Sequence, residues 1–470
     1  MRRRDCLSIA SGAGLAWWAE ALRLRLAPAA DLASDAASRA VNRADGFGRA
    51  KSVLVVVANG GQSQLETFDP RPDAPLEVRG EFGAIESSVP GTFLCEHLPQ
   101  LARLADRYAI VKSMSHEDLD HGSALYLALT GQYHVRRSSN PAPREIDHPF
   151  YGSVLEQVRP SAKFLRTSVL VNGPALVPFE PGPGQYPGLL GRRFDSLMIG
   201  DMTSGQAAVE GLERLDELDS QRHSRRRRLL QQLERTQSPS SQPAFEMQSI
   251  YQQAYAMLDR PAARDALDLE RERPETRERY GRHRPGQACL LARRLVEAEV
   301  PLVTVMWNHS NRGQDRYPDD EEQFGWDTHN DIFDVMGRSL LPRFDQSFSA
   351  LLEDLDQRGL LATTLVICMG EFGRAPLVAL ESRFAGATAG RKHWPAAYSI
   401  VMAGAGVRGG ATIGATDRHA AYPTSTKYGP WDVTATIFHA LGIDPSGHFY
   451  DSTNRPFAIS SGKPIAALYE

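Results

Sequence analysis

The chain has 470 residues, of which 42% are hydrophobic, and its formal net charge is -4 at pH 7. This composition is ordinary for a globular protein, and the small negative charge excludes a generally basic surface, so we expect no nucleic-acid partner. No apolar stretch reaches the roughly 20 residues of a membrane-spanning helix, so we expect no transmembrane segment. The four cysteines are scattered, which excludes a disulfide framework or a zinc knuckle.

The N-terminus has the features of an export signal. In residues 1–30, consecutive arginines precede a modest apolar stretch at 7–22, and small residues suited to cleavage follow at 27–29. The order RRDCL at residues 3–7 resembles a twin-arginine signal, so we expect a periplasmic or otherwise exported protein. Charged residues interrupt the apolar stretch, and the alternative is a cytoplasmic protein with an attached amphipathic helix. Residues 31–50 have the composition of a linker.

Six apolar runs, several of them rich in β-branched residues, are typical of buried parallel strands. They lie at 53–58, 108–111, 168–171, 301–306, 364–369 and 398–403, and helical patterns lie between them at 98–106, 122–129, 287–298, 333–358 and 432–441. This alternation predicts an α/β fold with a doubly wound, mostly parallel sheet flanked by helices. In such sheets the chemistry gathers beyond the carboxyl ends of the strands.

The stretch from about 205 to 280 differs from the rest of the chain. It is highly charged and includes four consecutive arginines at 225–228. Such a run is more often a solvated helix face than a binding site for an acidic partner. We therefore expect a helical insertion beside the sheet.

Polar clusters follow the first two strands. Asn59 ends the first strand and is followed by two glycines, whose amides can face an anion. The second cluster, at 115–123, contains two histidines and three carboxylates just before a helix, where free backbone amides favour an anion. Its last histidine, His121, precedes the helix predicted at 122–129. The glycine cluster alone is weak, because paired glycines also make simple turns. In the second cluster any single histidine is more often a surface or cap residue, but the density of polar residues favours a functional site.

Three more polar clusters lie in the second half of the chain. Asp327 and His329 are two residues apart, so in extended backbone both side chains point to one side, where both can reach one cation. Glu371 follows a buried strand, and it either binds a metal or pairs with Arg374. Cations and an imidazole, including Lys392 and His393, precede the last strand, where they can meet an oxyanion.

Together these motifs resemble those of the sulfatase-like bacterial family named domain of unknown function 1501. The matching segments are GGQSQLETFDP, SHEDLDHGSALYLALTG, WDTHND, GEFGR and HWPAAYSIVMAGAGVRGG, in this order from about residue 50 to the C-terminus. The resemblance implies that residues 51–470 form an alkaline-phosphatase-like domain. It also implies a metal-dependent hydrolase of phosphate or sulfate esters.

Carried over residue by residue, the superfamily pattern implies an atypical site. Asn59 stands where a metal-binding aspartate is usual, and His121, nine residues before Thr130, stands where a serine, threonine or cysteine nucleophile is usual. The metal ligands that remain implied are Asp327 with His329 or Asp331, together with His393 and Glu371. The resemblance thus implies a divalent metal, such as zinc, manganese or calcium.

Two functions follow from these residues. The first is an exported hydrolase of an anionic small-molecule or polysaccharide ester, in which His121 acts as nucleophile, base or ligand, and Arg374 and Lys392 hold anionic oxygens. The second is a non-catalytic binding or envelope-associated protein on the same fold, because Asn59 and the missing nucleophile depart from the pattern. A phosphomutase-like transferase is a weaker third alternative.

Overall fold

The computed structural model describes residues 46–205, 265–313 and 325–470, together with residues 225, 228, 229 and 232. The export signal, nearly all of the linker and most of the insertion at 205–280 lie outside the described residues, and these assignments stay predictions. Among the described residues, no helix combines the length and the apolar composition needed to span a bilayer.

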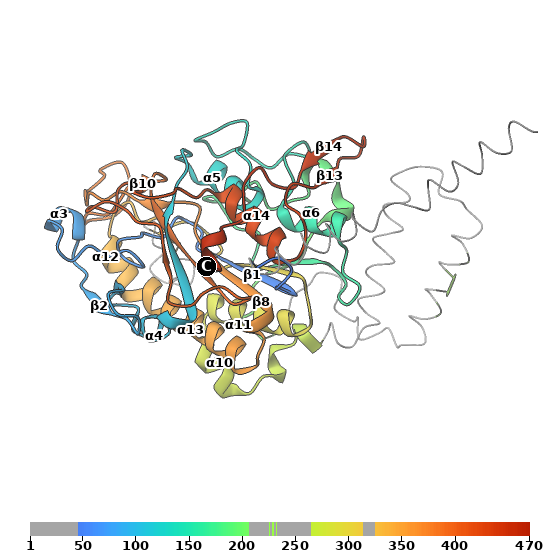
Figure 1. The fold of residues 1–470 in the computed structure, drawn as a ribbon, viewed down its shortest axis with the longest axis horizontal. Coiled ribbons are helices and arrows are strands. Elements are labelled where there is room, and N and C mark those ends of the chain that lie inside the picture. Colours follow the sequence, from blue (N-terminus) through green and yellow to red (C-terminus); the bar gives the residue numbers. More distant parts are fainter. Residues whose placement is uncertain (1–45, 206–224, 226–227, 230–231, 233–264, 314–324) are drawn as a thin grey trace, which may run out of the picture. The chain divides into compact units, whose positions relative to one another are not determined.

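An eight-stranded sheet forms the centre of the fold (Figure 1). In spatial order its strands are β12 (Thr412–Ile413), β4 (Tyr108–Met114), β11 (Tyr398–Ala403), β8 (Thr364–Met369), β1 (Ser52–Val57), β7 (Leu302–Met306), β5 (Ser168–Val171) and β6 (Leu197–Ile199). Every neighbouring pair is parallel except the two pairs that include β11. The predicted fold class and all six predicted strands are confirmed, whereas the short edge strands β6 and β12 were not predicted.

Helices cover both faces of the sheet, because the central strands are apolar on both sides. In β1, Val53, Val55 and Val57 pack in one cluster, and Leu54 and Val56 pack in the other. The helices α5 (His121–Thr130), α6 (Tyr151–Val158) and α14 (Pro430–Ala440) contribute to the first cluster. The helices α4 (Pro99–Arg103), α11 (Arg284–Glu297) and α13 (Leu341–Gln357) contribute to the second. Figure 1 shows the two groups on opposite sides of the strands.

The smaller elements lie in the connections. They are the helices α3 (Leu76–Arg79), α10 (Pro274–Tyr280) and α12 (Ile332–Val335), and the strands β2 (Ala84–Glu86), β3 (Phe93–Cys95), β9 (Gly373–Arg374), β10 (His393–Trp394), β13 (His448–Tyr450) and β14 (Pro456–Ala458). The helix predicted at 333–358 is interrupted by a π-helical turn, Met336–Leu340, between α12 and α13. Helix α6 was not predicted.

The direction of β11 decides which residues meet at one end of the sheet. Because β11 is antiparallel to its neighbours, its first residue, Tyr398, pairs with Met114 at the end of β4. The residues before β11 therefore lie at the edge where the parallel strands end. Immediately upstream, His393 pairs with Arg374 in the β9–β10 hairpin. Polar residues that precede β11 and polar residues that follow β1, β4, β7 and β8 thus share one edge.

Candidate metal centre

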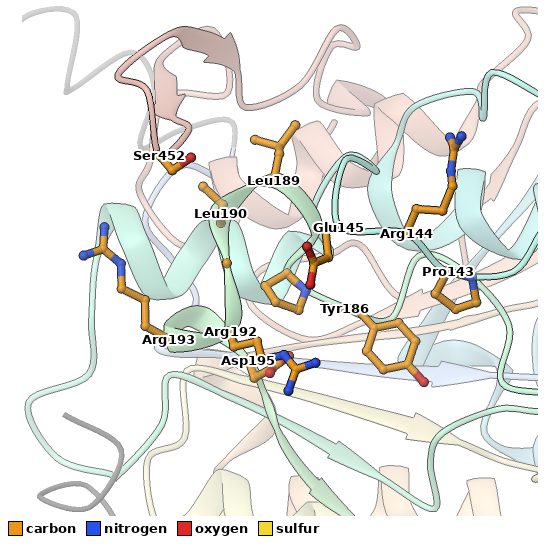
Figure 2. A pocket seen from close by; sticks show the side chains of 13 residues that line it. Pro143, Arg144, Glu145, Tyr186, Leu189, Leu190, Arg192, Arg193, Asp195 and Ser452 are labelled. Carbon is orange, nitrogen blue, oxygen red and sulfur yellow. The ribbon is translucent and has the colours of Figure 1, made fainter. Parts of the chain in front are cut away.

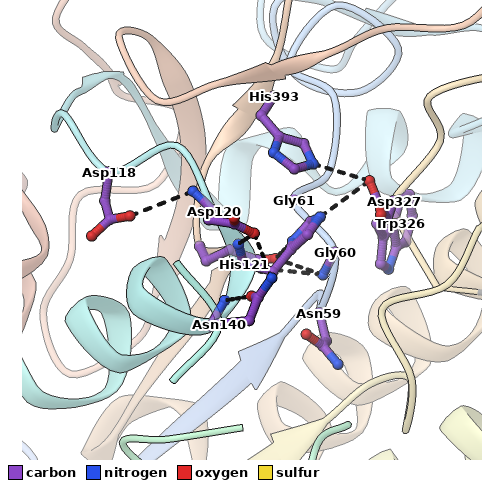
Figure 3. A network of polar contacts seen from close by, with 12 residues as sticks. Asn59, Gly60, Gly61, Asp118, Asp120, His121, Asn140, Trp326, Asp327 and His393 are labelled. Atoms are coloured by element: carbon purple, nitrogen blue, oxygen red, sulfur yellow. Dashed lines mark hydrogen bonds and ion pairs between the residues drawn. The ribbon is translucent and has the colours of Figure 1, made fainter. Parts of the chain in front are cut away.

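Three histidine rings converge on the carboxylate of Asp327, and Figure 3 shows two of them, His121 and His393, beside that carboxylate. The Nε2 atoms of His121, His329 and His393 lie 3.1, 3.2 and 3.3 Å from the Oδ1 atom of Asp327. The Nε2 atoms of His329 and His393 are 2.8 Å apart. These four side chains form the donor cluster.

Each part of the donor cluster comes from a different element. His121 is the first residue of α5, whose N-cap, Asp120, accepts a hydrogen bond from the His121 backbone N–H. Asp327 and His329 lie in the connection that follows β7, and His393 lies in β10. Residues separated by up to 272 positions (121 to 393) are therefore gathered by the sheet topology.

The opposite nitrogen of each histidine faces an oxygen atom. These Nδ1–oxygen pairs are His121 with Glu371 Oε1 at 2.6 Å, His329 with Glu381 Oε2 at 3.3 Å, and His393 with the Leu119 carbonyl at 2.7 Å. A neutral ring that donates from Nδ1 presents the Nε2 lone pair to the donor cluster. This is the arrangement by which proteins orient metal-binding histidines.

The charges around Asp327 favour its ionised form. Burial raises the pKa of Asp327, but the charges of His121 and Arg374 outweigh burial and hold that pKa well below its usual range. Burial lowers the pKa of His121, and Asp327 and Glu371 outweigh this effect and raise it to about 9. Burial and the charge of His121 lower the pKa of His393 to about 3. An ionised Asp327 and a neutral His393 are the protonation states that metal binding requires, whereas His121 would have to release a proton to become a ligand.

Arg374 lies behind Asp327 and is completely buried. One Nη2 bond, 2.9 Å long, reaches Asp327 Oδ1, and the same nitrogen donates to the carbonyl of Gly60. The Nε and Nη1 atoms donate to the carbonyls of Gly61 and Arg391 at 3.0 and 3.3 Å. Each guanidinium nitrogen thus has a protein partner, so the position of the Arg374 side chain is fixed. From this position Arg374 orients the Asp327 carboxylate.

Glu371 lies behind His121 and is also completely buried. Besides facing His121, its carboxylate accepts the Gly60 backbone N–H at 2.9 and 3.2 Å. The amide of Asn59 donates to the Leu176 carbonyl at 3.1 Å, and Figure 3 shows that side chain pointing away from His393. The predicted residues Glu371 and Arg374 thus support the donor cluster from behind, and Asn59 lies outside it.

A cavity of about 510 Å³ opens onto the donor cluster. Lys392 lines it with a side chain that is 61% exposed and lies 2.9 Å from Glu381. Arg383 also lines the cavity, pairs with Glu381 at 3.3 Å and is 73% exposed. These two long, exposed cationic side chains at the rim favour the entry of an anion.

Several residues of this site were not predicted from the sequence. Glu381 supports His329, and Phe384 stacks on the same ring with centroids 4.0 Å apart. Asn140 lines the cavity and donates to Asp120 at 2.8 Å. These three residues follow no strand and belong to no motif, so the sequence carries no signal for them.

The donor cluster fits a divalent cation. His121, Asp327 and His393 offer ligand atoms that all lie within 4.8 Å of one another, and His329 lies beside them. Three imidazole nitrogens and one carboxylate oxygen are a donor set typical of zinc, and such mixed ligands also suit manganese. The site is therefore a candidate metal centre.

Comparisons with solved structures give matches at low sequence identity. A crystal structure of Ps i-CgsB is 11% identical, with a TM-score of 0.42, and the match covers 89% of this chain and 76% of that chain. The lipoteichoic acid synthase LtaP from Listeria monocytogenes is 11% identical, with a TM-score of 0.39, and the match covers 91% of this chain and 81% of that chain. Alkaline phosphatase from the Antarctic bacterium TAB5 is 12% identical, with a TM-score of 0.38, and the match covers 83% of this chain and 97% of that chain.

No curated protein matches the sequence. A family match covers residues 50–469 and confirms the resemblance drawn from the sequence motifs. This chain belongs to the family described as protein of unknown function (DUF1501).

Proposed function

We propose that this chain is an exported, metal-dependent hydrolase of phosphate or sulfate esters. The observation that carries the proposal is the convergence of three oriented histidines on one buried, ionised carboxylate. The donor cluster would hold one divalent cation, with zinc the best fit to its donors. The adjoining cavity, with Lys392 and Arg383 at its rim, suits an anionic ester.

A bound divalent cation supplies Lewis acidity, which polarises an ester oxygen and lowers the pKa of water. Arg374 keeps Asp327 ionised and directed into the donor cluster, and Lys392 attracts the anionic group of the ester. In the overall reaction, water forms a new bond to phosphorus or sulfur. The bond to the ester oxygen breaks, and the alcohol leaves with one proton of the water.

The contacts of His121 support a ligand role in preference to a nucleophile role. Its Nδ1 atom lies 2.6 Å from Glu371 and its Nε2 atom lies 3.1 Å from Asp327, so both nitrogens face carboxylates. A nucleophilic imidazole needs one nitrogen directed at the substrate. We therefore assign His121 to metal binding and water to the attack.

Elemental analysis and an activity panel test this proposal. We expect the purified protein to hold close to one equivalent of zinc or manganese and to hydrolyse at least one aryl phosphate, phosphodiester or aryl sulfate. D327A and H393A should each lose the metal and at least 100-fold in kcat/KM. The control variant H448A replaces an exposed histidine and should keep both. Full metal content and activity in D327A and H393A would show that the assignment is wrong.

Export is tested separately. Cell fractionation should find the protein in the periplasm, and replacing Arg3 and Arg4 by lysine should retain it in the cytoplasm. A wild-type protein found only in the cytoplasm would remove export from the proposal and leave the hydrolase assignment intact.

A non-catalytic binding protein is the second candidate function. It is favoured by Asn59, whose amide bonds a backbone carbonyl, and by His121, whose two ring nitrogens both face carboxylates. A metal-loaded protein that turns over no ester of the panel would support this candidate, and any metal-dependent turnover would exclude it.

A further inference from the structure

A second cavity, of about 720 Å³, lies outside the candidate metal centre. It shares no lining residue with the first cavity. Figure 2 shows side chains from three segments around it, namely 143–145, 186–195 and Ser452. None of these residues has a part in the donor cluster.

The walls of the second cavity combine flat apolar surfaces with charge. Tyr186, Pro143 and Pro187 provide the flat surfaces. Arg192 and Arg193 are exposed, and neither guanidinium forms an ion pair with a carboxylate in the described part of the chain. The Arg193 guanidinium lies over the Phe194 ring, 4.5 Å from its centroid. Burial raises the pKa of Asp195, and the charge of Arg192 opposes this shift. Both arginine side chains are exposed, so each can still meet an anionic group from solvent.

The backbone of one wall is fixed in place. The Leu189 N–H donates to the Asp147 carbonyl at 3.0 Å, and a Cβ atom on Gly188 would lie 2.0 Å from the same oxygen. Arg144 holds the Asp147 carboxylate with bonds of 3.1 and 3.0 Å. Gly191 has φ +83°, and a Cβ atom there would meet no atom within 4 Å. The wall is thus a fixed turn beside open space.

The two cavities lie close to each other along the chain. Asn140 lines the first cavity and Pro143 lines the second. Three residues of extended chain span at most about 11 Å, so the Cα atoms of these two lining residues are no farther apart than this. A ligand of a few sugar units is long enough to reach from one cavity to the other.

We propose that the second cavity is an accessory site for an anionic saccharide segment, and that the substrate of the proposed hydrolase is a sulfated or phosphorylated glycan. This inference rests on the proposed function. A single arginine can bind a sulfate or phosphate group bidentately, so Arg192 and Arg193, whose side chains extend in different directions in Figure 2, would meet different anionic groups of the glycan. Flat aromatic faces pack against the apolar faces of sugars. Glu145 and Asp195, which also line the cavity, would accept hydrogen bonds from sugar hydroxyls.

Binding experiments on the full chain test the accessory site without relying on catalysis. Titration calorimetry would compare chondroitin sulfate hexasaccharide with the neutral hexasaccharide maltohexaose. We expect the sulfated probe alone to bind wild-type protein, and the double variant R192A/R193A to bind it at least tenfold more weakly. Tyr186→Leu, which removes the flat aromatic face, should also weaken binding. The control R338A removes an arginine of similar exposure that pairs with Asp334 and should bind as wild type does.

The possible results separate this inference from the proposed function. Equal binding by R192A/R193A and wild type, equal binding of the two hexasaccharides, or no binding of the sulfated probe would each overturn the accessory site. The double variant should keep full metal content and its kcat on a small aryl ester, because both arginines lie outside the donor cluster. Hexasaccharide binding without any ester turnover would count against the proposed hydrolase and leave the saccharide site in place.

Discussion

Replacing Glu371 by glutamine tests whether the partner behind His121 controls metal binding. Glutamine has nearly the same shape as glutamate. Its amide oxygen can therefore still accept the Gly60 N–H, whose nitrogen lies 2.9 Å from Glu371 Oε1 in the wild-type protein. The substitution removes the charge that faces His121 Nδ1 at 2.6 Å, and it places an NH₂ group where the second oxygen accepts at 3.2 Å. The size and burial of the side chain barely change.

The expected loss follows from the role of such partners. Removing a group that orients a metal-binding histidine typically lowers metal affinity about 10- to 100-fold, which is about 1.4 to 2.7 kcal/mol. E381Q changes the corresponding partner of His329. The His329 Nδ1 atom and the Glu381 Oε2 atom are 3.3 Å apart, a longer contact than that of His121 with Glu371, so we expect a smaller loss of metal affinity. Glu96 accepts a backbone N–H at 2.7 Å on the surface, and E96Q should leave metal affinity unchanged.

The measurement is a zinc titration in competition with a chromophoric chelator, accompanied by thermal unfolding of the metal-free proteins. The expected order of zinc affinity is wild type and E96Q first, then E381Q, then E371Q. Identical affinity in E371Q and wild type, with both proteins folded, would refute the orientation argument.

Three further predictions concern stability and the rim of the cavity. R374A should lower the free energy of unfolding by about 3 to 5 kcal/mol in urea denaturation, because the buried Asp327 carboxylate loses its partner; an effect no larger than that of R338A would contradict this. Burial lowers the pKa of His148 to about 4, so the unfolded chain binds this proton more readily, and up to about 3 kcal/mol of stability present above pH 6.5 should be lost as the pH falls toward 4. His148→Gln should flatten that pH profile, and an unchanged profile would exclude His148 as its source. K392A should raise KM for an anionic ester several-fold with little change in metal content, since its Nζ lies beside Glu381 at the rim; an unchanged KM would remove Lys392 from substrate capture.

The sheet was largely predictable because its strands are buried on both faces. Continuous apolar runs such as 53–58 and 364–369 leave few alternatives to a central parallel strand. The edge strands β6 and β12 contain only three and two residues, too few for a periodic pattern. Strand direction is also absent from the sequence pattern, since an apolar run has the same periodicity in either orientation. The sequence therefore predicts β11 as a strand but does not reveal that it runs antiparallel to its neighbours.

The members of the site were more predictable than their roles. Histidine and carboxylate residues near strand ends indicated His121, Asp327, His329 and His393, because few other functions explain such residues there. Whether Glu371 binds a cation or supports a ligand depends on where its carboxylate lies relative to the His121 ring, and only the fold fixes that position. Glu381 lies 52 residues after His329 in a loop without a motif, so only the fold reveals the contact.

The donor cluster also has a consequence for how the chain is held together. A cation bound there would cross-link α5, the connection after β7 and β10, three parts of the chain that otherwise meet through packing, hydrogen bonds and the contacts of His121 and His393 with Asp327. Chelation would then loosen these three regions together and leave β5 and β6 at the far edge of the sheet protected. Hydrogen exchange with and without chelator would show this pattern as a patch of newly exchanging amides at one end of the sheet.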